Sequence, residues 1–184
     1  MLSRPLVIGV SALFVMGLTL IASIGSTGPG QANAKTATTP LVLEDFFSGR
    51  TTGRGTFESG IAGVERDFIV TTNGHWDGEV LTLVEDFRYD DGETDRKTWR
   101  FTKIGEGQYT GTREDVVGKA KVAAEDGRIR MSYDIDLPRD NGRTTRLHFF
   151  DILEYQPDGS VLNTARVTKF AFPVGRVEVV FEKQ

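Results

Sequence analysis

The feature that most limits what this chain can fold into is a series of tight-turn signals. Asparagine or aspartate followed by glycine recurs at Asn73-Gly74, Asp77-Gly78, Asp91-Gly92, Asp126-Gly127, Asn141-Gly142 and Asp158-Gly159. Both residue types tolerate positive φ, so these pairs favour the turns of β-hairpins. The runs between them are rich in β-branched and aromatic residues and lack helical periodicity. The sequence therefore predicts an all-β domain of consecutive antiparallel strands.

The spacing of the turns predicts about nine or ten strands. They are expected at residues 53–59, 64–72, 76–90, 93–103, 108–113, 117–124, 128–136, 144–155, 161–170 and 175–183. Strands that follow one another through tight turns form an up-and-down meander, and closure into a β-barrel removes the edges that favour aggregation. A β-sandwich is the alternative. Residues 53–184 are assigned to this domain.

The segment before the domain, residues 35–52, is assigned to a tether and lead-in. Within it Leu43, Phe46 and Phe47 fall on one side of a short helical turn. Such an apolar turn is expected to cover one end of the sheet.

The register of one hairpin can be predicted at Asp90-Asp91-Gly92. A two-residue loop would place Leu83 opposite Arg100. A three-residue loop with Gly92 in the left-handed region places Leu83 opposite Trp99 instead. The second register brings apolar side chains together, so the sequence favours it.

Polar residues interrupt the apolar face of three strands. Glu85 alternates with leucine and aromatic residues and lies opposite Lys97 in the favoured register, and Asp151 also shares parity with apolar residues. Buried charges are costly unless they are paired. The expected pairs are Glu85 with Lys97, and Asp151 with Asn163 or Lys169. The candidate ligand-binding set is Glu85, Lys97, Trp99, Asp151, Asn163 and Lys169.

Three interpretations of these polar residues remain open. In the first, the polar residues form an internal network in which they satisfy one another. In the second, they line the polar end of a ligand cavity, and the two lysines face an anionic head group. The third interpretation is catalysis by a carboxylate.

An N-terminal apolar segment indicates export. Residues 5–25 carry no charge and follow Arg4, which by the positive-inside rule places the N-terminus in the cytoplasm. Residues 1–34 are either a signal peptide cleaved after Ala34, in an Ala-x-Ala site with Ala32, or an uncleaved signal anchor. Either alternative predicts a domain in the cell envelope, on the periplasmic side of the inner membrane.

Composition excludes several classes of function. The chain has no cysteine, so it has no thiol nucleophile, disulfide or lipidated N-terminal cysteine. Residues 35–184 contain 21 basic and 26 acidic side chains, a formal charge of −5, which argues against a nucleic-acid partner. No metal, cofactor or catalytic motif is present in the sequence, so no metal site, cofactor or catalytic residue is assigned.

Several spaced motifs resemble one protein family. They are Phe87-Arg-Tyr-Asp-Asp-Gly92, Arg96-Lys-Thr-Trp99, Tyr109-Thr-Gly111, Asp115-Val-Val-Gly-Lys-Ala120, Lys169-Phe170 and Phe181-Glu-Lys183. Over residues 41–183 the chain is similar to the Gram-negative envelope family called domain of unknown function 3833. The resemblance implies a lipocalin-like barrel in the periplasm. It also implies an association with phospholipid fatty-acid modification, which favours a lipid ligand.

The leading functional hypothesis is a barrel that binds a lipid, a fatty acyl chain or another hydrophobic molecule at the membrane. One alternative is a non-catalytic accessory subunit of an envelope complex. Another is a lipid-modifying enzyme that uses Glu85 or Asp151 as a general base.

Overall fold

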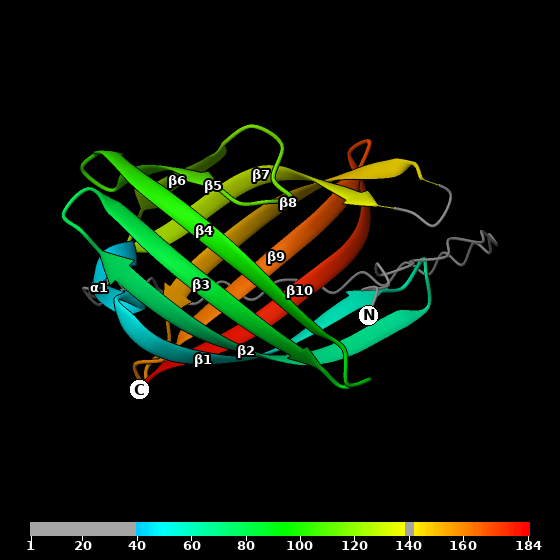
Figure 1. Cartoon of the computed structure of the whole chain (residues 1–184), viewed down its shortest axis with the longest axis horizontal. Helices are drawn as coiled ribbons and strands as arrows, with labels where there is room; N and C mark the ends of the chain where they lie inside the picture. The colour runs from blue at the N-terminus through cyan, green and yellow to red at the C-terminus, as the bar shows by residue number, and fades with distance from the viewer. Residues whose placement is uncertain (1–39, 139–141) are drawn as a thin grey trace, which may run out of the picture.

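The computed structural model describes residues 40–138 and 142–184, which form one short helix and ten antiparallel strands (Figure 1). The elements are α1 (Leu43–Phe47), β1 (Gly49–Ser59), β2 (Val64–Trp76), β3 (Val80–Tyr89), β4 (Thr94–Gly105), β5 (Gln108–Thr112), β6 (Ala120–Glu125), β7 (Arg128–Pro138), β8 (Thr144–Tyr155), β9 (Val161–Lys169) and β10 (Phe172–Lys183).

The strands close into a barrel in which each strand pairs with its neighbours in sequence and β1 pairs with β10. The prediction of a closed meander is therefore confirmed, and the sandwich alternative is wrong. The β3–β4 hairpin has the predicted register, with Leu83 opposite Trp99, and Gly92 lies in the left-handed region at φ 84°. Gly92 can adopt this conformation because it lacks a Cβ.

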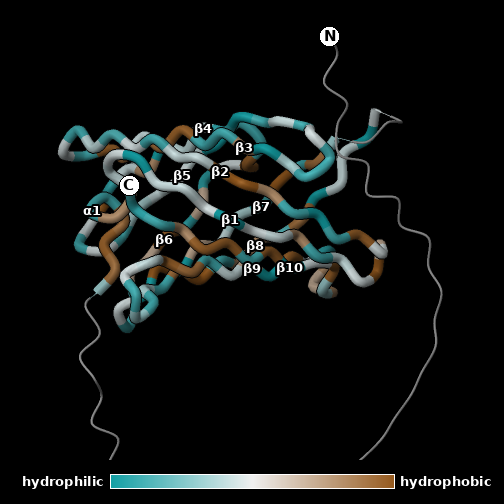
Figure 2. Tube along the Cα trace, turned by 90° about the horizontal axis from the view of Figure 1, so that it is seen from below, coloured by the Kyte–Doolittle hydropathy of each residue, from teal (hydrophilic) through white to brown (hydrophobic). Residues whose placement is uncertain are grey.

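One end of the barrel is closed by α1, as Figures 1 and 2 show from two directions. Leu41, Leu43, Phe46 and Phe47 are each at most 3% exposed. The ring of Phe47 packs edge-on against that of Phe181 in β10, with centroids 5.3 Å apart. The predicted apolar turn over one end of the sheet is therefore present. We call this end the closed end and the opposite one the open end.

A buried carboxylate anchors α1 to the wall of the closed end. Lys103 Nζ donates to Glu44 Oε1 over 2.6 Å, and the Tyr109 hydroxyl donates to Glu44 Oε2. Burial alone would raise the pKa of Glu44, but the hydrogen bonds from Lys103 and Tyr109 outweigh it and lower that pKa. The ionised form of Glu44 therefore stabilises the closed end.

The turn predicted at Asn73-Gly74 is absent, because β2 continues through these residues to Trp76. A Cβ on Gly74 would lie 1.8 Å from the backbone oxygen of Phe47. Glycine is needed here because the helical turn approaches the strand closely, and not because the chain reverses. The reversal follows at Asp77-Gly78, where Gly78 has φ 100°.

Other strand limits also differ from the prediction. β1 begins at Gly49, inside the predicted tether, and β10 begins at Phe172. Residues 117–119 do not belong to β6. They belong instead to a segment between β5 and β6 that pairs with β7, where Val117 N donates to Asp134 O over 2.8 Å. This segment, residues 113–119, covers the side of the barrel where β5 and β6 are short.

Residues 1–34, with the predicted signal peptide or anchor, lie outside the described residues. Within residues 40–138 and 142–184, no helix is long and apolar enough to cross a membrane.

Candidate functional site

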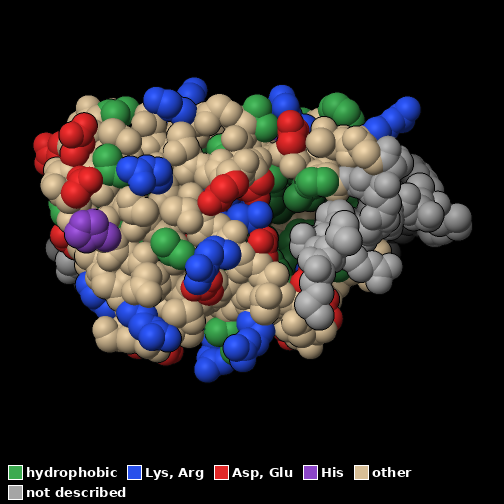
Figure 3. All heavy atoms as spheres, viewed as in Figure 1, with side chains coloured by type: hydrophobic (Ala, Val, Ile, Leu, Met, Phe, Trp, Pro, Cys, Tyr) green, Lys and Arg blue, Asp and Glu red, His purple; other side chains and the backbone are tan. Residues whose placement is uncertain are grey.

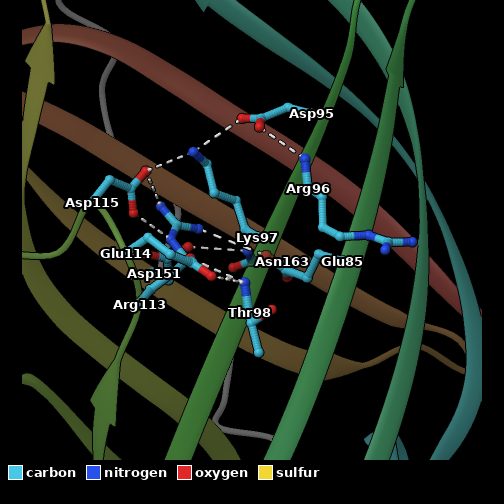
Figure 4. A network of polar contacts seen from close by, with 10 residues as sticks. All are labelled: Glu85, Asp95, Arg96, Lys97, Thr98, Arg113, Glu114, Asp115, Asp151 and Asn163. Carbon is cyan, nitrogen blue, oxygen red and sulfur yellow. Dashed lines mark hydrogen bonds and ion pairs between the residues drawn. The ribbon is translucent and has the colours of Figure 1, made fainter.

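Figure 4 shows a cluster of charged and polar side chains between facing strands of the barrel. Along β3 it lies between Leu83 on the side of the closed end and Phe87 on the side of the open end. Its centre is formed by Glu85 on β3 and Asp151 on β8, which are only 8% and 4% exposed. Both point inward, as the alternation of the strands predicts. We call the set Glu85, Lys97, Arg113, Asp115, Asp151 and Asn163 the interior polar cluster.

The predicted pair between Glu85 and Lys97 has the right backbone register but does not form an ion pair. The two residues are opposite each other in β3 and β4. Lys97 Nζ lies instead 3.1 Å from Asp95 Oδ2 and 3.7 Å from Asp115 Oδ2. The flexible lysine side chain reaches along its strand toward the open end, where two carboxylates stabilise its charge.

The cation beside Glu85 is Arg113, which was not among the candidate residues. Its side chain is 12% exposed, and Nη1 lies 3.7 Å from Glu85 Oε2 while Nε donates to Asp115 Oδ1 over 2.7 Å. The guanidinium carbon is also 4.7 Å from the centroid of the Trp99 ring. The alternation that points Tyr109 and Gly111 inward along β5 could have placed Arg113 here.

The second predicted pair is formed with Asn163 and not with Lys169. Asn163 Nδ2 donates to Asp151 Oδ1 over 3.0 Å across β8 and β9. Lys169 ends β9 at the open end, partly exposed, with Nζ 5.7 Å from the Phe170 ring. Lys169 is therefore a residue of the rim and not a member of the cluster.

Trp99 forms part of the wall behind the cluster. It is 3% exposed, stacks on Phe101 with centroids 5.0 Å apart, and meets Tyr133 edge-on at 5.2 Å. It thus supports Arg113 from one side. The amide of Thr98, on the same strand, donates to both oxygens of Glu114, and this holds the segment after Arg113 against β4.

Burial dominates the electrostatics of the two central carboxyl groups. Desolvation raises the pKa of Glu85 to about 7, although Arg113 opposes the shift. Desolvation likewise raises the pKa of Asp151 to about 6, against the hydrogen bond from Asn163 and the opposing effect of the nearby Tyr133 hydroxyl. Burial alone would lower the pKa of Arg113, but Tyr133, Glu85 and Asp115 raise it above its usual range. The cluster therefore contains a permanent cation and two carboxyl groups that titrate near neutral pH.

Three oxygen atoms of the cluster are buried without a hydrogen-bond partner among the described residues: Glu85 Oε2, Asp151 Oδ2 and Asn163 Oδ1. The Arg113 guanidinium is beyond hydrogen-bond length from Glu85 Oε2. Tyr133 lowers the pKa of Asp151 but does not make a well-formed hydrogen bond to Oδ2. Buried polar groups are normally paired, so these three acceptors need donors that the described residues do not supply at hydrogen-bond length.

The open half of the barrel has an accessible apolar lining. Six inward-pointing residues there are only partly buried, and we call them the open-end wall: Phe57, Phe87, Tyr89, Leu137, Phe149 and Val177. Most inward positions in the closed half, such as Leu81, Ile129 and Val161, are fully buried, although Trp76 and Tyr155 are partly buried there. Figure 3 shows a recess with hydrophobic side chains inside it and acidic and basic side chains at its edge.

The described residues do not form a metal centre. In the part of the chain that the structure covers, no three histidine, aspartate or glutamate side chains are grouped so that they could hold a metal ion. The arrangement instead combines an apolar wall with a polar end, which is typical of sites for organic ligands.

Comparison with known proteins gives the family of the chain. The family model of proteins of unknown function DUF3833 matches residues 18–183. The chain belongs to this family. No curated protein sequence matches it significantly.

The barrel is also similar to a solved structure, that of the S-type phycobiliprotein lyase CPES from Guillardia theta. The TM-score is 0.55 at 10% sequence identity, and the alignment covers 78% of this chain and 93% of the lyase. At this identity the likeness concerns the fold alone. It confirms the predicted lipocalin-like barrel for this member of the DUF3833 family.

Proposed function

We propose that this protein binds a lipid, a fatty acyl chain or another hydrophobic molecule inside the open half of its barrel. The observation that carries the proposal is the open-end wall, where inward-facing apolar side chains such as Phe87, Leu137 and Phe149 stay partly exposed. An apolar lining is expected to be fully packed unless a ligand occupies the space before it. The lipocalin-like fold is compatible with this use.

We further propose that the protein works at the periplasmic surface of a membrane. The apolar segment at residues 5–25 and the family resemblance support export. The rim of the open end supports contact with lipid, because Phe170 is 86% exposed, Phe172 73% and Ile61 52%. The turns that carry them are neighbours, since β1 pairs with β10.

The hairpin between β9 and β10 presents its aromatic residue at a conformational cost. Phe170 and Ala171 form a two-residue loop with φ of 50° and 67°. Positive φ at both positions suits asparagine and glycine, and costs other residues about 1–2 kcal/mol each. A strained turn that exposes a phenylalanine beside an accessible apolar interior supports a role at the lipid surface.

Substitution of the open-end wall tests the proposal. The full chain, purified and held in lipid nanodiscs, is titrated with a fluorescent long-chain alcohol, with empty nanodiscs as the blank. Val177→Trp places a large side chain inside the open half and is expected to weaken binding by at least tenfold. Val180→Trp, on the same strand but pointing outward at 38% exposed, is the matched control and should bind normally. Equal binding by both variants would contradict the proposal.

A second candidate function, that of an accessory subunit, is favoured by the outer surface. Ile69 on β2 and Val180 on β10 are 40% and 38% exposed, and both lie opposite Arg54 of β1. They border an outer groove of about 530 Å³ across these strands. Under this alternative, Val180→Trp would disrupt co-purification with an envelope protein from detergent-solubilised membranes, whereas Val177→Trp would not.

A further inference from the structure

The proposed binding of a hydrophobic ligand does not specify the polar group that the ligand carries. The unpaired atoms of the interior polar cluster indicate the chemistry of that group. We propose that the cluster receives a head group that donates hydrogen bonds, such as a primary ammonium or a hydroxyl group on a hydrophobic chain, and rejects carboxylate and phosphate heads. This inference rests on the proposed function and assigns the chemistry of the same site.

The first argument is the kind of atom that is left unpaired. Glu85 Oε2, Asp151 Oδ2 and Asn163 Oδ1 are all buried oxygen atoms, and none has a donor at hydrogen-bond length among the described residues. The Tyr133 hydroxyl faces Asp151, and Arg113 Nη1 lies 3.7 Å from Glu85 Oε2. The side-chain nitrogen of Asn163 donates to Asp151. The side-chain oxygen of Asn163 therefore remains as the atom without a partner. The amide oxygen can only accept, and so can the two carboxylates at a pH above about 7, where both are mostly ionised. A ligand that satisfies these atoms must therefore bring O–H or N–H groups.

The second argument is that the neighbouring cations are already paired. Arg113 bonds Asp115 through Nε and Nη2 and faces Glu85 through Nη1. Lys97 lies between Asp95 and Asp115. An anionic head group would have to displace one of these carboxylates from its cation. In Figure 4 both cations point toward their carboxylate partners.

The third argument is the sign of the local charge. The side chains drawn around the cluster include the acids Glu85, Asp95, Glu114, Asp115 and Asp151, against Lys97 and Arg113. Arg96, also drawn, is engaged outside the barrel by Asp86 over 2.5 Å. Glu114 is exposed, so four acids lie around the cluster against two bases. The local field therefore favours a cation or a neutral donor over an anion.

An aromatic path connects the cluster with the open-end wall. Phe149 stacks on Tyr133 with centroids 5.4 Å apart, and Tyr133 meets Trp99 edge-on, next to Arg113. A chain that lies along the open-end wall therefore directs its head toward Asp151 and Glu85. The apolar part and the polar part of the site can be occupied by one amphiphile.

The test compares ligands with one chain and different heads. The full chain in nanodiscs carries Trp76→Phe, so that Trp99 is the only tryptophan and its emission reports occupancy beside the cluster. It is titrated with octylamine, octanol, octanoate, octyl phosphate and octyltrimethylammonium, the last being a cation without N–H donors. Octylamine and octanol are expected to bind on the order of tenfold more tightly than the two anions, because an acceptor left unpaired costs about 1–3 kcal/mol. Octyltrimethylammonium should bind less tightly than octylamine.

A pair of variants separates the cluster from general charge effects. Asp151→Asn replaces a buried acceptor with an N–H donor and should reduce the preference for octylamine over octanoate at least fivefold. Asp134→Asn removes an outward carboxylate on β7 that bonds His148, and should leave the preference unchanged. Glu85→Gln provides a second substitution within the cluster if Asp151→Asn unfolds the barrel.

The outcomes distinguish the two levels of the proposal. Octanoate or octyl phosphate binding as tightly as octylamine would overturn the assignment of the head group. If all five amphiphiles bind alike and Val177→Trp abolishes their binding, the proposed function stands and only this inference fails. If none of them binds, both the inference and the proposed function fail.

Discussion

The closed half and the open half of the barrel are built from the same strands, yet their inward side chains differ in how completely they are buried. At the closed end α1 fills the space between the strands, and residues such as Phe47 and Leu81 are almost completely buried. At the open end, inward aromatic residues such as Phe87 and Phe149 keep part of their surface accessible. The difference indicates that the closed half is packed more completely, and the proposed ligand site lies in the open half.

Two buried carboxyl groups show the same difference in electrostatic terms. Glu44 at the closed end receives hydrogen bonds from Lys103 and Tyr109, and its pKa is lowered. Glu85 in the interior polar cluster faces a more distant Arg113, and burial raises its pKa to about 7. A complete set of partners makes a buried charge stabilising, whereas an incomplete set makes it costly.

The largest expected effect is that of truncating an aromatic side chain in each half. Phe47→Ala should destabilise the protein by about 3–5 kcal/mol, since it empties a packed site. Phe87→Ala removes a side chain that is already partly exposed, and should cost only about 1–2 kcal/mol. Chemical denaturation of the two variants measures both values. Equal losses would show that the two halves are packed alike.

The pH dependence of Glu85→Gln is the next largest effect. Because the folded-state pKa of Glu85 is raised, the native state holds a proton that the unfolded state has lost between pH 4.5 and about 7. Wild-type stability from this group therefore falls as pH rises through that range, by about 3 kcal/mol. The free energy of unfolding of the variant does not fall in this way. The difference, variant minus wild type, should therefore become more positive from pH 4.5 to pH 8. A constant difference across this range would refute the assignment.

Glu44→Gln should show the opposite sign. The folded-state pKa of Glu44 is lowered, so its contribution is present above the unfolded value of 4.5 and is lost as pH falls through the folded value. At pH 7 the variant should be about 2 kcal/mol less stable than wild type, because a charge-assisted pair is lost. The deficit should shrink in acid. Thermal unfolding between pH 3 and pH 8 gives both trends.

The smallest effect concerns the rim hairpin. Phe170→Asn with Ala171→Gly relieves two positive-φ residues, but the new glycine also raises the conformational entropy of the unfolded chain. The net stabilisation should therefore be about 1–2 kcal/mol. The same change should reduce co-sedimentation with phospholipid vesicles. Ile104→Asn, which replaces a residue 61% exposed at the closed end, is the matched control and should not alter co-sedimentation. A rim variant that sediments like wild type would argue against lipid contact at the open end.

Local sequence patterns predict the strands and the inward positions well, because alternation and turn chemistry act over a few residues. Glu85 and Asp151 were identified in this way, and Gly92 indicated the register of its hairpin. The domain boundary at residue 34 and the binding roles of the candidate residues stay predictions.

What could not be predicted depends on contacts between distant segments. Gly74 was taken for a turn residue because the approach of Phe47 cannot be seen in the local sequence. The alternation of β5 can place Arg113 inward, but its contact with Glu85 also depends on the path of the segment after β5, which pairs with β7. The choice of Lys97 between Glu85 and Asp95 depends on the rotamers of a long side chain, which strand pairing does not determine.

Because β1 pairs with β10, the barrel can close only late in the synthesis of the chain. Thr51 lies opposite Lys183, so the first strand finds one of its two partners only when the last residues of the chain have been added. A chain that ends before Phe172 leaves both β1 and β9 with an unpaired edge, which is the form of a sheet that associates with other chains. The 12-residue strand β10 therefore determines whether β1 and β9 are paired or leave exposed edges.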